Sequence, residues 1–517
     1  MTSPAAPRAR ASTALTDRAF FGHPRGLGLL FFCELWERFS YYGMRAILVI
    51  YLMNGRGWSG VDATRLYGAY TGMVWLTPLI GGYLADRVLG TRRSLAIGGL
   101  TIAAGHFLLA IESMPMFYCG LVLIVIGTGF FKPNVSTMVG QMYEAGDARR
   151  DVGFTIFYTG INIGSFVAPL VCGALAESPR FGWHFGFAAA GVGMTLGVIT
   201  FLWGRDRYLP GVGLAPAHLR DTEVEAEIGE LGTQSNGRNA TIGAIGGVIV
   251  AVMVGTPSWS AVGMPTWIFS LSGIMTLAFG LIIGAAFAVA ILGTQGVERQ
   301  RVYALTTVCF FAVFFWLVFE QAGSSLTIFA DKDTDRTIGA GLFGMTLIPT
   351  SWFQSIQPLC IILLSPMAAV FWSMLQKRRL EPSTSMKMVW GLFFGGLGFF
   401  LLIFAGRAVD AGAKVGPWFL VGAYFCHSVG ELFLSPVGLS YVTKVAPPQF
   451  VSLLMGAWFL SIGAASFLGG FLAGLIETIP SRANFFTIPT ATAWGAGLVM
   501  LLCVPQLRKL TRSVPDA

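Results

Sequence analysis

The sequence predicts an all-α polytopic membrane protein with two six-helix halves and two extra transmembrane helices. Hydrophobic residues make up 54% of the 517 residues and charged residues only 12%, and the mean hydropathy is +0.68. Soluble globular proteins do not combine these features. Apolar runs of roughly 18 to 25 residues, each long enough to span a bilayer, recur along the chain. They form two sets of six and one pair, so 14 spanning helices are expected.

The first set forms an expected N-terminal bundle, residues 27–204. Its helices are expected at 27–53, 64–85, 94–112, 115–138, 153–176 and 185–204. The second set forms an expected C-terminal bundle, residues 301–505. Its helices are expected at 302–325, 348–375, 388–406, 417–441, 450–476 and 486–504.

The remaining segments form a linker and two tails. Residues 205–300 are expected to carry the two extra helices, at about 241–257 and 267–292, after a Glu-rich surface helix at 221–230. Residues 1–26 and 506–517 are the tails. Two six-helix halves joined by a linker are common among secondary transporters.

The distribution of Lys and Arg predicts the orientation, because these residues stay on the cytoplasmic side. With the N-terminus inside, the inner segments hold 23 of the 34 Lys and Arg residues, whereas the outer loops hold 8. Both tails are therefore expected in the cytoplasm. The basic N-terminal tail lacks the apolar core of a cleaved signal peptide. The net charge of +8 arises largely from the Lys and Arg residues of the inner segments, so it requires no nucleic-acid partner.

The sequence gives little support for enzyme chemistry or for a metal site. The common motifs of metalloproteases, phosphate-binding loops and serine hydrolases are absent in a usable context. The cysteines are odd in number, lie in or at the ends of apolar runs and lack ligand spacing, so they are expected to be buried thiols. They are Cys33, Cys119, Cys172, Cys309, Cys360, Cys426 and Cys503.

One loop has a recognisable motif. The stretch Gly81 to Arg93, "GGYLADRVLGTRR", resembles the loop motif of the major facilitator superfamily, in which an acid and several bases latch helix ends on the cytoplasmic face. The stretch Ser365 to Arg379 is a weak echo of it at the corresponding place in the second half. A plain positive-inside loop is the alternative explanation.

Ionisable and tyrosine side chains lie on one face of the first expected helix. At 100° per residue they fall within a sector of about 140°, which must face protein or water because a charge turned to lipid is costly. The opposite side holds Trp36, Phe39 and Gly43. The members of this polar stripe are Glu34, Glu37, Arg38, Tyr41, Tyr42 and Arg45.

Pairing within the helix explains part of the stripe. Glu34 and Arg38 are at i and i+4, in the favourable order for an ion pair. This pairing leaves Glu37 and Arg45 without partners on the same helix, so their partners are expected elsewhere.

Three more charges lie in other expected helices, namely Lys132, Glu320 and Glu431. The acids in the membrane then outnumber the bases by one. A buried carboxylate short of cations takes up a proton readily, so the excess suits a proton carrier. A purely structural network of charges is the alternative.

These residues resemble the proton-dependent oligopeptide transporter (POT) family of the major facilitator superfamily, bacterial type. The resemblance rests on four stretches in the expected order over both halves. They are "ELWERFSYYGMRAIL" in the first helix, "FFKPNVS" in the fourth, "FYTGINIGS" in the fifth and "GELFLSPVGLSYVTKVAP" from the tenth. The family implies the major facilitator fold and proton-driven import of di- and tripeptides by alternating access. It also implies the inner (plasma) membrane of a bacterium as the location.

The resemblance also implies the roles of particular residues. Proton coupling falls on Glu34, Glu37 and Arg38, and we add Glu320 as a further acid in the membrane. The peptide carboxylate would bind Arg45 and Lys132, and the peptide amino group would bind Glu431. The cavity would be lined by Tyr41, Tyr42, Tyr70, Asn162, Trp316, Ser435 and Trp458. Where the family usually has Asn before a proline, this sequence has Gln357, which we place on the cavity wall next to a helix break.

The charges support this assignment independently. A peptide is a zwitterion, so cations from one half and a carboxylate from the other can bind both ends of its backbone. The coupling ion is the proton, no cofactor is expected, and we expect a monomer in contact with membrane lipid. The alternative is the same scaffold moving another small zwitterion or anion, such as nitrate, an amino-acid conjugate or a drug-like peptide mimic. A channel or sensor is a weaker alternative, since neither tail is long enough for a signalling domain.

Depth along the helices predicts two gates. At 1.5 Å per residue, Arg45 and Glu320 share a level in the outer half of the membrane, and Lys132 and Glu431 lie in the inner half. We expect the first pair to bridge when the cavity is shut to the outside and the second when it is shut to the inside. His427, one turn before Glu431, is expected to be a packed neutral histidine, although a role in tuning that acid is the alternative.

Overall fold

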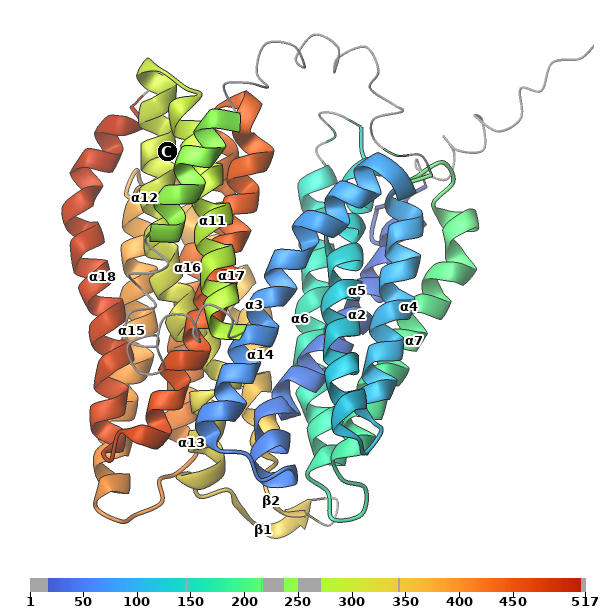
Figure 1. The fold of residues 1–517 in the computed structure, drawn as a ribbon, viewed down its shortest axis with the longest axis vertical. Coiled ribbons are helices and arrows are strands. Elements are labelled where there is room, and N and C mark those ends of the chain that lie inside the picture. The colour runs from blue at the N-terminus through green and yellow to red at the C-terminus, as the bar shows by residue number, and fades with distance from the viewer. Residues whose placement is uncertain are drawn as a thin grey trace, which may run out of the picture. The chain divides into compact units, whose positions relative to one another are not determined.

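The structure, a computed structural model, describes residues 17–144, 147, 149–214, 216, 237–249, 271–342 and 345–512. The described part is almost entirely helical (Figure 1). The named α-helices are α2 (Arg25–Ile50), α3 (Gly60–Leu84), α4 (Thr91–Leu109), α5 (Met114–Gln141), α6 (Arg149–Ala176), α7 (Trp183–Tyr208), α11 (Leu271–Leu292), α12 (Gly296–Phe319), α13 (Ser325–Lys332), α14 (Ile356–Lys377), α15 (Thr384–Asp410), α16 (Trp418–Val445), α17 (Val451–Thr478) and α18 (Arg482–Leu510).

Short turns and one small sheet complete the described structure. The turns are η1 (Tyr51–Gly55), η2 (Ala85–Leu89), η4 (Glu320–Gly323), η5 (Thr350–Ser355) and η6 (Pro448–Phe450). Strands β1 (Thr337–Leu342) and β2 (Met345–Leu347) pair antiparallel, with Thr337 opposite Leu347.

Each of the twelve main expected spans overlaps a helix, and the bounds agree within four residues except for α12, α14 and α18, where they differ by six to eight at one or both ends. Of the extra pair, α11 corresponds to the second, and residues 237–249 form a helix at the start of the first. The remainder of the first extra span and the Glu-rich stretch 221–230 lie outside the described residues.

Ten helices in the described part are long and apolar enough to cross a membrane. Helices α2, α3 and α4 are not among the ten, although the sequence predicts them as spans. For α2 the reason is visible in its composition, because it carries five charged side chains. These are Arg25, Glu34, Glu37, Arg38 and Arg45.

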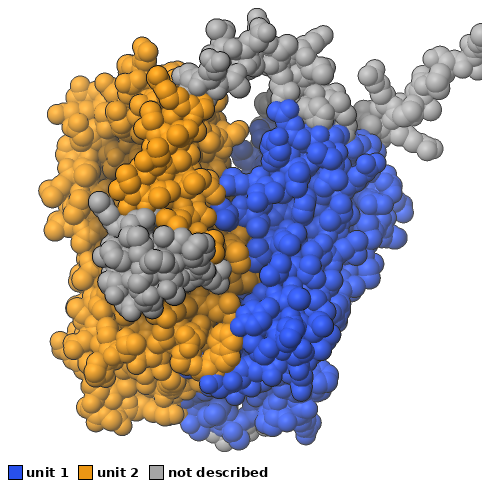
Figure 2. Space-filling model, viewed as in Figure 1, with its two compact units in different colours: residues 1–57, 76–225, 336–362 blue, residues 58–75, 226–335, 363–517 orange. Residues whose placement is uncertain are grey.

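The chain folds into two compact units (Figure 2). Unit 1 comprises residues 1–57, 76–225 and 336–362, and unit 2 comprises residues 58–75, 226–335 and 363–517. Each unit therefore includes a short segment from the other half of the sequence. Residues 58–75, which contain the first part of α3, belong to unit 2, and residues 336–362, which contain the start of α14, belong to unit 1.

In unit 1, glycines hold α2 closely against α6 and α7. Gly160 and Gly164 of α6 face α2, and a Cβ at Gly160 would lie 2.8 Å from Phe31. A Cβ at Gly197 of α7 would lie 3.0 Å from Trp36. Small residues four apart let helix backbones approach closely. The apolar side of α2, at Trp36 and Phe39, therefore packs on α7, whereas α6 also contacts Arg38 of the polar stripe.

Helices α4 and α5 of unit 1 also pack through glycines. A Cβ at Gly98 would lie 2.7 Å from the carbonyl oxygen of Gly127, and one at Gly105 would lie 2.8 Å from that of Gly120. Both contacts are closer than a real Cβ tolerates, so any larger residue would force these two helices apart.

Arg92, in the loop motif of unit 1, binds the end of α7. Its Nε donates to the carbonyl of Val212 at 3.1 Å, and Nη1 pairs with Asp206 at 2.9 Å. It also donates to the carbonyl of Leu209. Cations near a helix C-terminus complement its exposed carbonyls. Arg92 therefore latches this helix end, as the motif predicts for one of its bases.

Unit 2 has an apolar core shared by α12, α15, α16, α17 and α18. Helix α18 packs on α15 through Trp494, whose ring stacks on Phe393 at 5.9 Å and donates a hydrogen bond to the Phe393 carbonyl at 3.0 Å. The largest side chains of the core include Phe315, Trp316, Tyr441 and Trp458.

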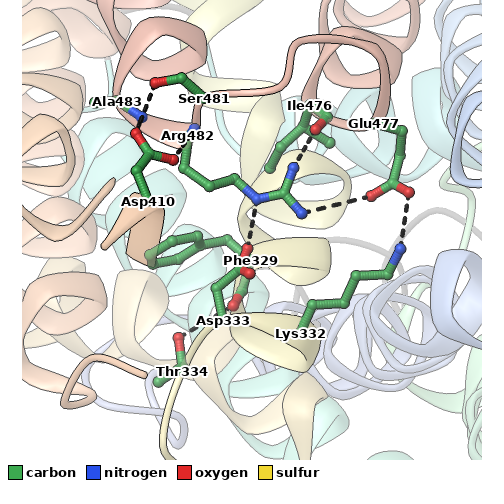
Figure 3. A network of polar contacts seen from close by, with 10 residues as sticks. All are labelled: Phe329, Lys332, Asp333, Thr334, Asp410, Ile476, Glu477, Ser481, Arg482 and Ala483. Atoms are coloured by element: carbon green, nitrogen blue, oxygen red, sulfur yellow. Dashed lines mark hydrogen bonds and ion pairs between the residues drawn. The ribbon is translucent and has the colours of Figure 1, made fainter. Parts of the chain in front are cut away.

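A polar network closes one end of unit 2, where α17 ends and α18 begins (Figure 3). The carboxylate of Asp410 accepts hydrogen bonds from the backbone of Arg482 at 2.6 Å and of Ala483 at 3.2 Å, at the start of α18. Arg482 pairs with Asp333 at 2.8 Å, and Lys332 pairs with Glu477 at 2.8 Å. The two bonds to Asp410 satisfy backbone N–H groups that the start of α18 leaves open, and the ion pairs join side chains of this end.

The structure corrects the expectation that all seven cysteines are buried. Cys33, Cys172, Cys309 and Cys426 are buried, as expected. Cys119 is exposed, and Cys360 and Cys503 are half-buried. An apolar run in a membrane protein turns one face to lipid, so a cysteine within it can lie on the surface as easily as in the core.

Candidate functional site

The polar stripe of α2 lies in unit 1 and is buried. Exposure is 3% for Glu34, 0% for Glu37, and 6% for both Arg38 and Arg45. Charges so far from solvent require partners or bound ligands, because an unpaired buried charge is strongly unfavourable.

Arg38 pairs with both acids of the stripe. Its Nε lies 2.8 Å from Oε1 of Glu34 and 2.6 Å from Oε2 of Glu37. The first contact is the predicted i, i+4 pair. The second contact corrects the expectation that Glu37 has no partner on its own helix. The helix directs the side chains of Glu37 and Arg38 about 100° apart, but the long arginine side chain bends far enough to reach Glu37. Two carboxylates thus share one guanidinium.

A further cation of unit 1 acts on this cluster. Lys132 of α5 is half-buried and interacts electrostatically with Glu37. The structure therefore places this residue, predicted to bind the peptide carboxylate, close enough to influence a residue predicted to couple protons.

Aromatic rings flank the two buried arginines of α2, Arg38 and Arg45. The guanidinium of Arg38 lies over the Tyr41 ring at 5.7 Å, and that of Arg45 lies over the Tyr42 ring at 5.6 Å. Cation–π contacts of this kind stabilise a guanidinium that has left water. Asn162 of α6 is buried and donates to the Tyr158 carbonyl at 3.0 Å.

Gln357 lies in the first turn of α14, within unit 1. The expected helix break is not observed at this position, because the 3₁₀ turn η5 continues directly into α14 at Ile356. Pro358 is accommodated in the first turn, where the backbone N–H groups have no partner within the helix. Gln354 lies three residues earlier in the chain. Its Nε2 donates to the carbonyl of Ala46 at 3.3 Å, and Ala46 is the residue that follows Arg45 on α2.

In unit 2, Glu320 is 5% exposed and begins a tight turn. Helix α12 ends at Phe319, and residues Glu320–Gly323 form the 3₁₀ turn η4. The next residue, Gln321, is fully buried and donates to the carbonyls of Leu317 at 3.0 Å and Gly469 at 3.1 Å. This glutamine therefore fixes the turn that carries Glu320.

The other predicted residues of unit 2 lie in or beside its core. Trp316 and Trp458 belong to the same buried cluster, and Trp458 packs directly on Gly438 of α16. Glu431, on α16, is 8% exposed, and Ser435 one turn later is half-buried. His427 packs on Gly398 and on the Phe399 ring of α15, which favours the packing interpretation.

The predicted site residues thus fall into two groups. Unit 1 holds Glu34, Glu37, Arg38, Tyr41, Tyr42, Arg45, Lys132, Asn162 and Gln357. Unit 2 holds Tyr70, Trp316, Glu320, Glu431, Ser435 and Trp458. Each predicted gate, Arg45 with Glu320 and Lys132 with Glu431, takes one residue from each unit, and both gates stay predictions.

Two polar residues were missed by the sequence analysis. Gln321 stands next to Glu320 in an apolar run, and that adjacency was an available signal. Glu177 follows α6 and looks like an ordinary loop residue, yet its carboxylate binds the backbone of Thr350 and Ser351, more than 170 positions away. Burial raises the pKa of Glu177, and the hydrogen bonds from these residues oppose the rise.

Among the described residues, no group of three His, Cys, Asp or Glu side chains is arranged to hold a metal ion.

Comparison with known proteins places this arrangement in a family. Residues 92–210 and 244–491 match the model described as the POT family. The chain belongs to the POT family. It is 36% identical over 517 residues to the peptide transporter YePEPT of Yersinia enterocolitica, covering 96% of this chain and 97% of that protein. It is 32% identical over 511 residues to the di-/tripeptide transporter of Lactococcus lactis subsp. cremoris, covering 96% and 99%.

The fold of this POT family member agrees with solved structures. A crystal structure of the peptide transporter POT in complex with sulfate matches it with a TM-score of 0.80 at 37% identity, covering 97% of this chain and 99% of that one. The predicted all-α fold of the major facilitator superfamily is confirmed. The protein is a multi-pass membrane transporter and not an enzyme.

Proposed function

We propose that this protein is a proton-coupled symporter that imports di- and tripeptides by alternating access. The observation that carries the proposal is the buried contact of Arg38 with both Glu34 and Glu37. Among these three groups the carboxylates exceed the guanidinium by one negative charge, and a proton can neutralise that excess. Such a group can be loaded and unloaded with a proton in each transport cycle.

The distribution of charges supports a zwitterionic substrate. Unit 1 carries Arg45 and Lys132, the cations predicted to bind a peptide carboxylate. Unit 2 carries Glu431, the acid predicted to bind the peptide ammonium group. The names of the Yersinia and Lactococcus relatives, a peptide and a di-/tripeptide transporter, support the same substrate class.

The proposal includes an orientation and a location. Both termini lie in the cytoplasm, because the inner segments then hold most Lys and Arg residues. The protein lies in the bacterial inner (plasma) membrane in contact with lipid and works as a monomer. Protons are the coupling ion, and the transport cycle needs no cofactor.

Uptake into proteoliposomes tests the function. An inward proton gradient is imposed, and the accumulation of dialanine, trialanine, a free amino acid and nitrate is compared. We expect gradient-dependent accumulation of the two peptides only. Accumulation of nitrate or the free amino acid without either peptide would favour the alternative substrate on the same scaffold. Equal uptake with and without the gradient would contradict proton coupling.

A further inference from the structure

The 3₁₀ turn η5, which leads into α14, is bound to α6 by two side-chain hydrogen bonds within unit 1. The ring N–H of Trp352 donates to the carbonyl of Leu170 at 3.0 Å. The hydroxyl of Ser355 donates to the carbonyl of Phe166 at 2.8 Å. Pro169 interrupts the hydrogen-bond ladder of α6, and helix carbonyls near such an interruption are open to outside donors.

Glu177 completes this attachment at the end of α6. Its Oε2 accepts from the backbone N–H of Thr350 at 2.7 Å, and its Oε1 accepts from the N–H of Ser351 at 3.1 Å and from the Ser351 hydroxyl at 2.9 Å. Arg336 lies 3.5 Å from Oε2. The side chain of Glu177 is only 14% exposed. One carboxylate therefore holds two consecutive backbone donors at the beginning of η5, with both oxygens in use.

The same segment reaches the predicted substrate residues. Gln354, in η5, donates a hydrogen bond to the carbonyl of Ala46 on α2, and Ala46 directly follows Arg45. Gln357 follows in the first turn of α14, which η5 leads into. The direction in which Gln357 points is thus set by a turn that is anchored at its start by Glu177 and near its end by Gln354.

We infer that Glu177 is a positioning residue for substrate binding, because its carboxylate holds η5 on α6 and so fixes Gln354 against α2 and Gln357 in the first turn of α14. This inference rests on the proposed function. Glu177 itself does not touch the substrate in this scheme.

The attachment depends on the ionised carboxylate. When a carboxyl group is protonated, the oxygen that carries the proton becomes a donor and is a much weaker acceptor for a backbone N–H. Burial raises the pKa of Glu177, so this loss occurs at a higher pH than for an ordinary glutamate. The charged group that faces Glu177 in the described structure is Arg336, while η5 supplies only neutral donors. His184, at the start of α7, contacts a different acid, since its Nε2 lies 3.1 Å from Oε1 of Glu112.

The test compares Glu177→Gln with the matched control Glu112→Gln, which removes a carboxylate from an exposed pair in the same unit. Dialanine uptake is measured at equal pH on both sides of the membrane, from pH 5 to 8. At neutral pH we expect Glu177→Gln to raise KM about three- to tenfold with a nearly unchanged maximal rate, since hydrogen bonds to a charged group are lost. The control stays within about twofold of wild type. Ser351→Ala removes one bond of the set and has a smaller effect in the same direction.

The pH profile separates positioning from a general loss of structure. As the pH falls and the wild-type carboxyl becomes protonated, the KM values of wild type and Glu177→Gln should converge. An equal KM for the two proteins at neutral pH would overturn the inference.

Hydrogen exchange of the backbone amides gives a second measurement that does not depend on transport. In Glu177→Gln, peptides covering residues 350–358 should exchange faster than in wild type, whereas those covering α4 and α5 should not. Unchanged exchange at 350–358 overturns the attachment itself. If wild type accumulates no peptide at all, the proposed function fails, and the exchange result alone then decides whether Glu177 holds this segment.

Discussion

Nε of Arg38 lies 2.6 Å from Oε2 of Glu37, the residue immediately before it in the chain. Neighbouring side chains on a helix normally diverge, so this contact requires the arginine to turn along the helix surface. The arginine is also held by Glu34, one turn away. Removing the charge of Glu37 therefore leaves Arg38 with a partner and the helix with its packing.

We predict that Glu37→Gln abolishes uptake driven by a proton gradient but leaves peptide exchange across the membrane measurable. The amide keeps the size of the side chain and removes its titration, so substrate binding and proton coupling separate. Proteoliposomes loaded with unlabelled dialanine measure exchange, and empty ones with an imposed gradient measure accumulation. Full gradient-driven accumulation by the variant would remove Glu37 from the coupling role.

The predicted outer gate can be tested by exchanging charges. Arg45→Glu should stop dialanine uptake, and adding Glu320→Arg should raise the rate at least about fivefold, because paired residues couple energetically. Adding Glu431→Arg to Arg45→Glu is the mismatched control and should not restore transport. A double variant no better than Arg45→Glu alone would speak against the pair.

The two gates can also be examined by an experimental structure open to the cytoplasm. Arg45 and Glu320 should then lie within about 4 Å of each other, while Lys132 and Glu431 are apart. A separation of Arg45 and Glu320 above about 10 Å in that state is too large for an ion pair and would contradict the assignment.

Substitutions at Gln357 test the cavity wall. Gln357→Asn keeps the amide and should preserve transport while changing the order in which competing peptides inhibit dialanine uptake. Gln357→Leu removes both the donor and the acceptor and should lower the affinity for at least some peptides about three- to tenfold. Unchanged affinity of Gln357→Leu for every peptide would place the residue outside the site.

His23 should make the stability of unit 1 depend on pH. It is 4% exposed, and its Nδ1 lies 2.9 Å from the hydroxyl of Tyr143. Burial lowers the pKa of His23 from its ordinary 6.5, Arg149 lowers it further, and Asp147 opposes them. The unfolded chain therefore binds a proton more readily than the folded one, so stability is complete above about pH 6.5 and is lost as the pH falls below it.

The measurement is thermal unfolding in detergent from pH 5 to 8. Wild type should lose melting temperature at the acidic end, and His23→Asn should lose less over the same interval. Tyr143→Phe, which leaves the buried imidazole without this hydrogen bond, should reduce the free energy of unfolding by about 1 to 3 kcal/mol at neutral pH. Parallel pH curves for wild type and His23→Asn would rule out this histidine as the cause.

Helix periodicity predicted the arrangement of α2 correctly. Counting 100° per residue separated the charged stripe from Trp36, and in the structure Trp36 packs on α7 while Glu34 pairs with Arg38. These are local properties, because residues within two turns of a helix have nearly fixed relative positions. The spans followed from composition for the same reason, since each depends on a continuous apolar run.

Contacts between distant segments could not be derived in this way. The bond from Thr350 to Glu177 joins residues on different helices, and nothing in the sequence around either one specifies the other. The same holds for Gln321 and Gly469, whose contact depends on how α17 packs beside η4. Such pairs are set by the tertiary arrangement and not by spacing along the chain.

The composition of the two units has a consequence for dividing the polypeptide. A cut in the linker between residues 216 and 237 gives one fragment without residues 336–362 and another without residues 58–75. Each fragment then lacks a segment that its own unit contains, so neither can complete that unit alone. The two fragments should accumulate in a cell only when they are synthesised together, and each made singly should be degraded.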